Sequence, residues 1–178
     1  MDLEIPVYEQ GYLDGLCGVY SIINATRLLV KNISEEESMQ LFKKCLTHVE
    51  RKKSLSHVIT DGISRTELMS ILKDIVTADY PIISKFPFRG VRNIGVQDFF
   101  GEIRAFLNEK GTRAVIVGFD CRDWDHWTVV KSVSPKRVTL FDSAMMKTIN
   151  ISNCMLEKKT KAKQYKFSVN ETFFLLTK

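Results

Sequence analysis

The first half of the chain carries apolar residues at the spacing of amphipathic helices. After residue 17 they fall near the i, i+3, i+4, i+7 spacing of a helix, at Val19, Ile22, Ile23, Leu29 and Val30. This period predicts a helix with one buried face that begins near Cys17. Two further helices have capping boxes at their starts, Ser34 with Glu37 and Ser64 with Glu67.

Between these two helices the periodicity breaks, and we expect residues 50–62 to form a surface excursion. A fourth helix is predicted over about 96–109, stopped by Gly111, because glycine readily adopts the left-handed conformation of a helix end.

The second half changes to β-branched and aromatic segments separated by short polar turns. Strands are predicted over 113–119, 126–133, 137–143, 147–152 and 172–178. The turns between them are short enough for an antiparallel meander. The fold class expected is therefore α+β, with N-terminal helices packed face to face on a C-terminal antiparallel β-sheet.

Length and hydropathy limit the architecture and the setting. The 178 residues suit one domain, which we expect to span 1–178. No run approaches the roughly 18 apolar residues of a membrane span. The start Met-Asp-Leu-Glu-Ile-Pro has neither the basic nor the apolar region of a secretory signal. These features predict a cytoplasmic protein without membrane insertion.

Charge and cysteine content exclude several classes of site. The net charge is +5, but lysines and arginines are spread along the chain. The densest basic stretch, 157–166, is interpreted as a solvated loop, and the aromatic residues do not accompany it, which argues against nucleic-acid binding. The four cysteines are widely scattered and form no zinc or C-x-x-C motif. We expect reduced thiols and neither a metal nor another cofactor.

Cys17 is the first candidate for chemistry. A cysteine is nucleophilic as the thiolate, which the amides and dipole of a helix N-terminus stabilise. The backbone N–H of Cys17 could donate to a developing oxyanion, and Gly15 and Gly18 allow a substrate to approach closely. Gln10, seven positions upstream, could supply a second donor.

A general base for this thiol must come from the three histidines of the chain. His48 and His57 are interpreted as surface residues, whereas His126 opens a predicted strand. Asp125 is adjacent to His126, but neighbouring strand residues point to opposite faces. If a hairpin forms around Pro135, residues whose numbers sum to about 268–271 face each other, and His126 with Asp142 gives 268. Asp142 is thus expected to orient His126.

Each of these residues taken alone is more often structural than catalytic. A cysteine at a helix start is commonly core, and an aspartate at a strand end commonly forms a turn. Trp124 and Trp127 could wall a substrate cleft beside His126 or pack the sheet against the helices. The combination of a glutamine, a cysteine, a histidine and an aspartate in this order, each in suitable secondary structure, favours a catalytic relay. In it Cys17, His126 and Asp142 act together, with Gln10 as the oxyanion donor.

The sequence resembles the papain-like cysteine peptidases, and among them the bacteriocin-processing peptidases that remove double-glycine leaders, with their stand-alone relatives. The similar segments are Q-G-Y-L-D-G-L-C-G-V (10–19), D-G-I-S-R-T-E-L (61–68), H-W-T-V-V (126–130) and L-F-D-S-A (140–144). The resemblance implies a papain-like fold, Cys17 as nucleophile, His126 as base, Asp142 as its orienting partner and Gln10 in the oxyanion hole. Ser143 stands where that group commonly has proline.

Three functions remain open at this point. The first is a cysteine peptidase that hydrolyses a peptide or isopeptide bond of a peptide or protein substrate through an acyl-enzyme. The second is an acyltransferase or glutamine deamidase that uses the same site on a protein. The third is a silent module that has kept the fold and binds a partner. The oligomeric state is not predicted.

Overall fold

The computed structural model describes residues 5–91, 93–121, 124–156 and 164–178. Its helices are α1 (Cys17–Leu29), α2 (Glu35–Glu50), α3 (Leu55–Asp61), α4 (Arg65–Ile71), a π-helical turn (Leu72–Val76), α5 (Thr77–Asp79) and α6 (Val96–Asn108). Its strands are β1 (Ile82–Lys85), β2 (Arg113–Asp120), β3 (Asp125–Val133), β4 (Arg137–Phe141), β5 (Thr148–Asn150), β6 (Cys154–Met155) and β7 (Tyr165–Thr177), with a 3-10 turn (Ile151–Asn153) before β6. The protein is α+β, as predicted.

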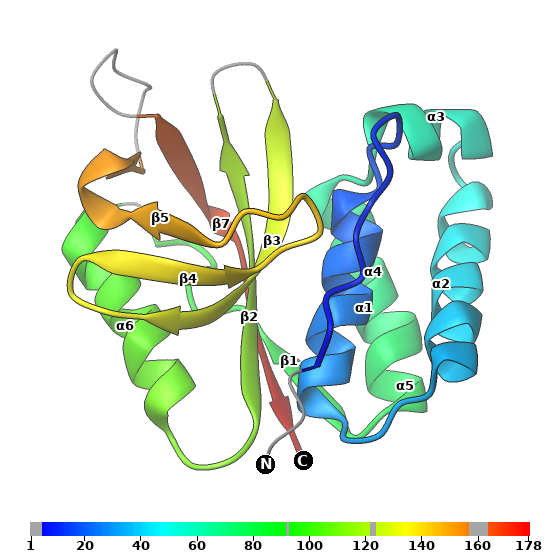
Figure 1. Ribbon diagram of the computed structural model, residues 1–178, viewed down its shortest axis with the longest axis horizontal. Coiled ribbons are helices and arrows are strands. Elements are labelled where there is room, and N and C mark those ends of the chain that lie inside the picture. Colours follow the sequence, from blue (N-terminus) through cyan, green and yellow to red (C-terminus); the bar gives the residue numbers. More distant parts are fainter. Residues whose placement is uncertain (1–4, 92, 122–123, 157–163) are drawn as a thin grey trace.

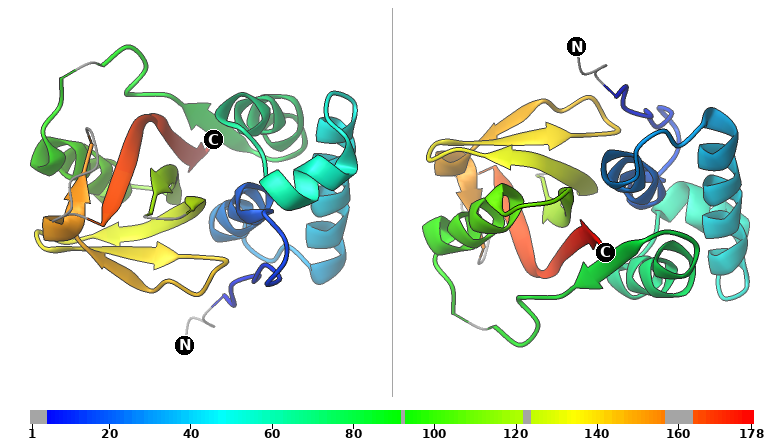
Figure 2. Two further views of the ribbon diagram at one scale, coloured as in Figure 1. Left: turned by 90° about the horizontal axis from the view of Figure 1, so that it is seen from above. Right: turned by 90° about the horizontal axis from the view of Figure 1, so that it is seen from below.

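The helices and the sheet form two adjoining halves (Figure 1), with α1 between the sheet and α2 in both views of Figure 2. The sheet has the order β1-β7-β2-β3-β4-β5, and its neighbours along this path are antiparallel. Side chains of β2 alternate between two cores. Ala114 and Ile116 pack in the core that includes α1, whereas Val115 and Val117 pack in the core that includes α6. Successive side chains of a strand point to opposite faces of the sheet, so one sheet can contribute to both cores.

Helix starts follow the capping signals of the sequence. The Ser34 hydroxyl accepts from Glu37 N and the Ser64 hydroxyl accepts from Glu67 N, each in a complete capping box, so both predicted starts are confirmed. The predicted span of α6, about 96–109, agrees with the structure to within one residue, but its C-cap is Glu109 and not Gly111. The helix ends at Asn108, and Gly111, with φ 96°, lies in the turn that leads into β2.

The segment 50–62 is not a plain surface excursion, because α3 forms within it. Seven residues span only about two turns, too few for the period to stand out in the sequence. Gly62 follows α3 with φ 72°, and a Cβ there would lie 2.5 Å from Gly15 O. Glycine is therefore required at this position, both for its backbone conformation and for the close packing of α3 against the segment before Cys17.

The meander is confirmed for β2 to β5, but the last strand is placed differently. β7 lies on the other side of β2 and begins at Tyr165 rather than near residue 172. On its outer side it pairs with β1, a four-residue strand that the sequence analysis missed. β6 adds a short parallel pairing. Of the basic stretch 157–166, residues 157–163 lie outside the described residues.

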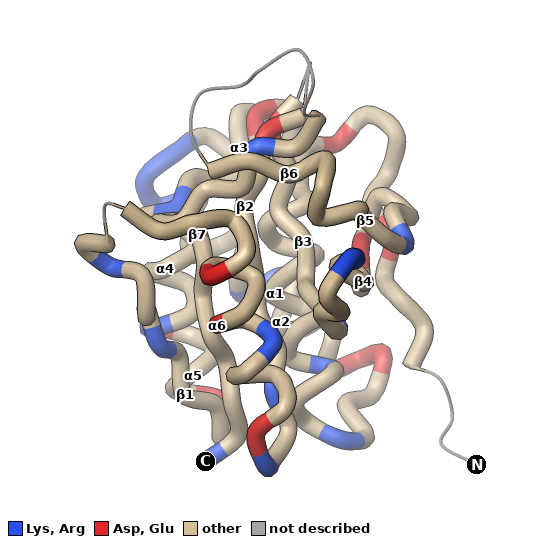
Figure 3. Tube along the Cα trace, turned by 90° about the vertical axis from the view of Figure 1, so that its left-hand side faces the viewer, with Lys and Arg blue, Asp and Glu red and all other residues tan. Residues whose placement is uncertain are grey.

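Charged residues of both signs are distributed over several elements (Figure 3). Within the described ranges, no helix combines the length and the apolar character needed to cross a lipid bilayer.

Candidate active site

Cys17 is the first residue of α1, and its side chain is largely buried. Its sulfur accepts a hydrogen bond from the backbone N–H of Trp127 on β3, with Sγ and N 3.5 Å apart. The N–H of a first helical residue has no partner within its own helix. The sulfur therefore sits at the positive end of the α1 dipole, beside a backbone donor.

The segment before α1 is held in place by Asp14. Its Oδ2 accepts from Gly11 N at 2.6 Å and its Oδ1 accepts from Leu16 N at 3.1 Å. Gly15 N donates to Ile59 O of α3 at 2.6 Å. An aspartate that bonds nearby amides in this way fixes a turn. Asp14 thus fixes the chain that leads to the nucleophile position, a role the sequence analysis did not identify.

His126 and Asp142 form a buried pair, with His126 Nε2 2.6 Å from Asp142 Oδ1. Opposed residues of β3 and β4 have numbers that sum to 270 or 271, within the predicted range. Continuing this register places Asp142 opposite Thr128, on the same face of the sheet as His126. The sequence prediction that Asp142 lies beside His126 is confirmed.

The bond to Asp142 determines which nitrogen of His126 is available for chemistry. Nε2 is taken by the carboxylate, and Nδ1 has no hydrogen-bond partner among the residues that the structure describes. Burial lowers the pKa of His126, but the hydrogen bond and charge of Asp142 and the nearby Cys17 sulfur outweigh it and raise the pKa to about 9. The imidazole is consequently poised to take and hold a proton at Nδ1.

Asp142 is itself fixed by the turn that follows it. Its Oδ2 accepts from the N–H groups of Ala144 and Met146, each at 3.0 Å. Burial raises the pKa of Asp142, but the hydrogen bond from His126 and the positive charge of that imidazole lower it by more. The pKa of Asp142 is therefore below its usual value. The carboxylate is the form that this turn binds.

Gln10 lies in the same site, as predicted. Its backbone N donates to Ser143 O at 3.1 Å, and its Oε1 accepts from the Ser143 hydroxyl at 3.0 Å. Its Nε2 donates one hydrogen to Asp14 O at 3.3 Å. A side-chain amide carries two N–H donors, so one remains for a ligand. Ser143, adjacent to Asp142 in the chain, thereby orients the Gln10 amide.

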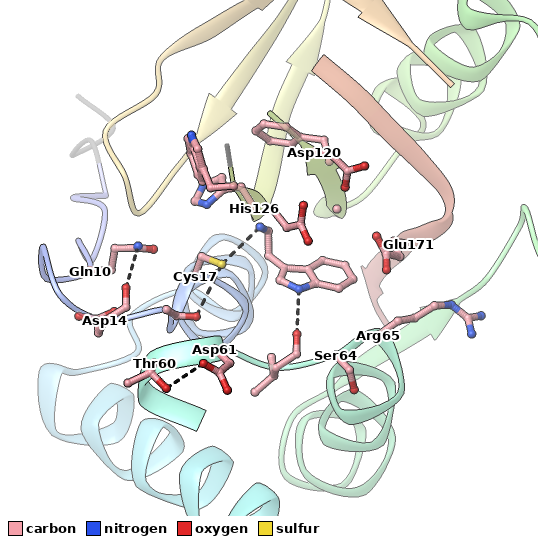
Figure 4. Close-up of a pocket in the computed structure, with 18 of the residues that line it drawn as sticks. Gln10, Asp14, Cys17, Thr60, Asp61, Ser64, Arg65, Asp120, His126 and Glu171 are labelled. Atoms are coloured by element: carbon pink, nitrogen blue, oxygen red, sulfur yellow. Dashed lines mark hydrogen bonds between the residues drawn. The ribbon is translucent and has the colours of Figure 1, made fainter. Parts of the chain in front are cut away.

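These residues line a cleft of about 570 Å³ between the helices and the sheet (Figure 4). Trp124 is half exposed and its ring lies 4.7 Å from that of His126, centroid to centroid. Trp127 is buried and its indole N–H donates to Ile63 O at 3.1 Å. Trp124 therefore walls the cleft over His126, and Trp127 joins the sheet to the segment after α3.

The other two histidines do not line this cleft. His57 is exposed, as expected. His48 is not a surface residue: its side chain is largely buried, and its Nε2 lies 2.7 Å from the Ser70 hydroxyl on α4. A polar ring between two helices satisfies its hydrogen bonding through such a partner.

The raised pKa of His126 predicts that stability depends on pH. The charged imidazole is favoured in the folded state, so its contribution is complete below about pH 6.5 and is lost as the pH rises through about 9. We expect the free energy of unfolding to fall by on the order of 2–3 kcal/mol over this range relative to a His126→Gln variant. Urea unfolding at several pH values measures it. If the unfolding free energies of the native protein and the variant changed in parallel with pH, His126 would not be the source of the pH dependence.

Among the described residues, no group of three or more His, Cys, Asp or Glu side chains is placed to hold a metal ion. All four cysteines are buried and none forms a disulfide. No family model matches the chain, and a search of curated proteins finds no match.

Proposed function

We propose that this protein is a papain-like cysteine hydrolase that cleaves a peptide or isopeptide bond through an acyl-enzyme intermediate. The observation that carries the proposal is the state of His126. One ring nitrogen is bonded to the buried Asp142, and the other is buried without a partner in the described structure, in the cleft that also contains Cys17. A structural histidine would normally satisfy both nitrogens.

The chemistry follows from this arrangement. The Cys17 sulfur attacks the carbonyl carbon of the scissile bond after its proton has passed to His126 Nδ1. The oxyanion that develops accepts hydrogen bonds from the Cys17 N–H and the remaining N–H of Gln10. His126 then protonates the leaving amine as the C–N bond breaks. Water, deprotonated by His126, releases the acyl group from sulfur and restores the thiol.

Asp142 contributes by holding the imidazole rather than by accepting its proton. Its bond to Nε2 directs Nδ1 away from β4 and stabilises the imidazolium that forms in each half of the reaction. The papain-like assignment is supported by the chain order, in which a glutamine and a cysteine at a helix start precede a histidine and an aspartate on adjacent strands. It is further supported by the location of the cleft where helices meet an antiparallel sheet.

The pH dependence of iodoacetamide labelling tests this proposal. If Cys17 forms an ion pair with His126, we expect it to be alkylated well below pH 7, several units below the range of an ordinary thiol. The other cysteines provide an internal control. Cys45 is the clearest of them, because burial raises the pKa of its thiol to about 12. Mass spectrometry assigns the labelled site at each pH.

A His126→Ala variant is the matched comparison. Loss of acidic-pH labelling at Cys17 in that variant supports the ion pair. If Cys17 of the native protein reacts no faster than Cys121 or Cys154, the cleft lacks an activated nucleophile and the proposal of a hydrolase is wrong.

A further inference from the structure

The charges around the cleft are not evenly distributed. Among the described residues, five carboxylates line it, Asp14, Asp61, Asp120, Asp125 and Glu171, against Lys53, Arg65 and the imidazole of His126, which is already paired with Asp142. The chain as a whole has a net charge of +5, so the composition does not account for an acidic cleft. Figure 4 shows Gln10 and Asp14 on one side of Cys17, and Asp120 and Glu171 on the other. The cleft therefore has an acidic side, formed by Asp120, Asp125 and Glu171 of the sheet.

Asp14 and Asp61, the two carboxylates outside the acidic side, accept hydrogen bonds from groups close to them in the chain. Asp14 accepts from two backbone amides, and Asp61 accepts from the Thr60 hydroxyl. In the described structure, neither Lys53 nor Arg65 forms an ion pair with the acidic side. Lys53 Nζ donates to Gly62 O at 3.0 Å and Arg65 Nε donates to Asn170 O at 2.7 Å.

Glu171 is placed over the cleft by an irregularity in the sheet. In the β2–β7 register Val117 faces Thr172 and Phe119 faces Phe167, so residues 168–171 stand opposite Gly118 alone. A bulge of this kind redirects a side chain at a sheet edge or site. A Cβ on Gly118 would lie 2.7 Å from a carboxylate oxygen of Glu171, so the glycine leaves the space that the Glu171 side chain occupies.

The surroundings compensate the negative charge of Glu171 only in part. Within the described ranges it forms no ion pair. Burial and then the neighbouring charges of Asp120 and Asp125 raise its pKa, against a hydrogen bond from Ser168 and the charge of Arg65. Asp120 has one lysine partner, Lys166, with Nζ and Oδ2 3.3 Å apart. A cation entering the cleft would relieve the repulsion among these carboxylates.

A second observation indicates that a ligand enters this space. His126 lines the same cleft, is 2% exposed, and has an Nδ1 without a hydrogen-bond partner in the described structure. We propose that the acidic side, with Glu171 as the principal contact, binds a lysine or arginine side chain of the substrate close to the bond attacked by Cys17. This inference rests on the proposed function and names the substrate class, peptides with a basic residue near the cleaved bond.

Two series of peptide electrophiles that alkylate Cys17 test the inference without requiring turnover. One carries a chloromethyl ketone at its carboxyl end and the other a bromoacetyl group at its amino end, so the peptide extends from the sulfur in either direction. A single lysine is moved through each series and compared with Nε-acetyl-lysine, which keeps the length but lacks the charge. At one position we expect lysine to label on the order of tenfold faster or more, the effect of one charge-assisted hydrogen bond.

Variants of Glu171 test whether this residue causes the preference for lysine. Glu171→Gln should remove it and Glu171→Lys should transfer it to a probe carrying glutamate, whereas Glu102→Gln on α6, exposed and away from the cleft, should leave it unchanged. The comparison of lysine with acetyl-lysine uses the native protein alone, so it stands even if a variant fails to fold.

Each outcome decides between the two proposals. If Cys17 is labelled rapidly but lysine confers no advantage in either series, or the advantage survives in Glu171→Gln, the cation subsite is wrong while the hydrolase proposal stands. If no probe labels Cys17 faster than it labels the other cysteines, both proposals are overturned.

Discussion

Replacing either Cys17 or His126 by alanine is expected to lower the rate of peptide hydrolysis on the order of 10⁴- to 10⁶-fold. Without the sulfur no acyl-enzyme can form. Without the imidazole the thiol loses the group that accepts its proton and later protonates the leaving amine. Because the two side chains act in the same step, the double variant should be no slower than the slower single variant. Steady-state kcat/KM on a peptide cleaved by the native protein measures these effects.

Cys45→Ala is the matched control for the loss of a thiol. Cys45 is fully buried on α2 and does not line the cleft, so this variant should keep its activity while losing some stability. Activity that survives in Cys17→Ala, or effects of the two single variants that multiply in the double variant, would assign the reaction to other residues.

Asp142→Asn is expected to be damaging even though asparagine has almost the same shape. One carboxylate oxygen accepts from His126 Nε2, and the other accepts from the N–H groups of Ala144 and Met146. An amide has only one oxygen. Turned toward the Ala144 and Met146 amides, its NH₂ group faces donors, and burial prevents water from relieving this conflict. Turned toward His126, it donates to Nε2 and places the ring proton on Nδ1, the nitrogen that must act as the base. We expect kcat/KM to fall on the order of 10²- to 10⁴-fold, as the imidazole loses its orientation.

The same substitution should lower the free energy of unfolding by about 1–3 kcal/mol, since the buried hydrogen bond to His126 loses its carboxylate charge. Urea unfolding measures this term separately from activity. Asp79→Asn is the matched control, because Asp79 forms an exposed pair with Lys44, and such pairs contribute only about 0–1 kcal/mol. Native-like activity and stability in Asp142→Asn would mean that a neutral acceptor suffices and that the turn 142–146 does not select a carboxylate.

The parts of this site that could be predicted from the sequence were those with local signals. The capping boxes at Ser34 and Ser64 place two helix starts correctly because a cap requires specific residues at a fixed spacing. Asp142 could be paired with His126 because a short hairpin fixes which residues face each other.

The parts that could not be predicted depend on contacts between distant segments. Glu171 and Gly118 meet only because β7 crosses to the far side of β2, and no local pattern indicates that strand order. The seven-residue α3 and the four-residue β1 are stabilised by what they pack on, so their own sequences carry little periodicity. The assignment of Nε2 to Asp142 and Nδ1 to the cleft depends on ring orientation, which residue numbers do not specify.

The position of β7 has a consequence for how the protein is made. This strand follows every other strand in the chain, yet it lies inside the sheet, with β1 on one side and β2 on the other. During translation, β2 to β5 can pair as they emerge from the ribosome, but the edge of β2 stays open until residue 177 has left the exit tunnel. The chain thus passes through a stage in which β2 to β5 can be paired while β7 and β1 have not yet joined the sheet. The exposed β2 edge is then the part of the sheet most open to pairing with a wrong strand.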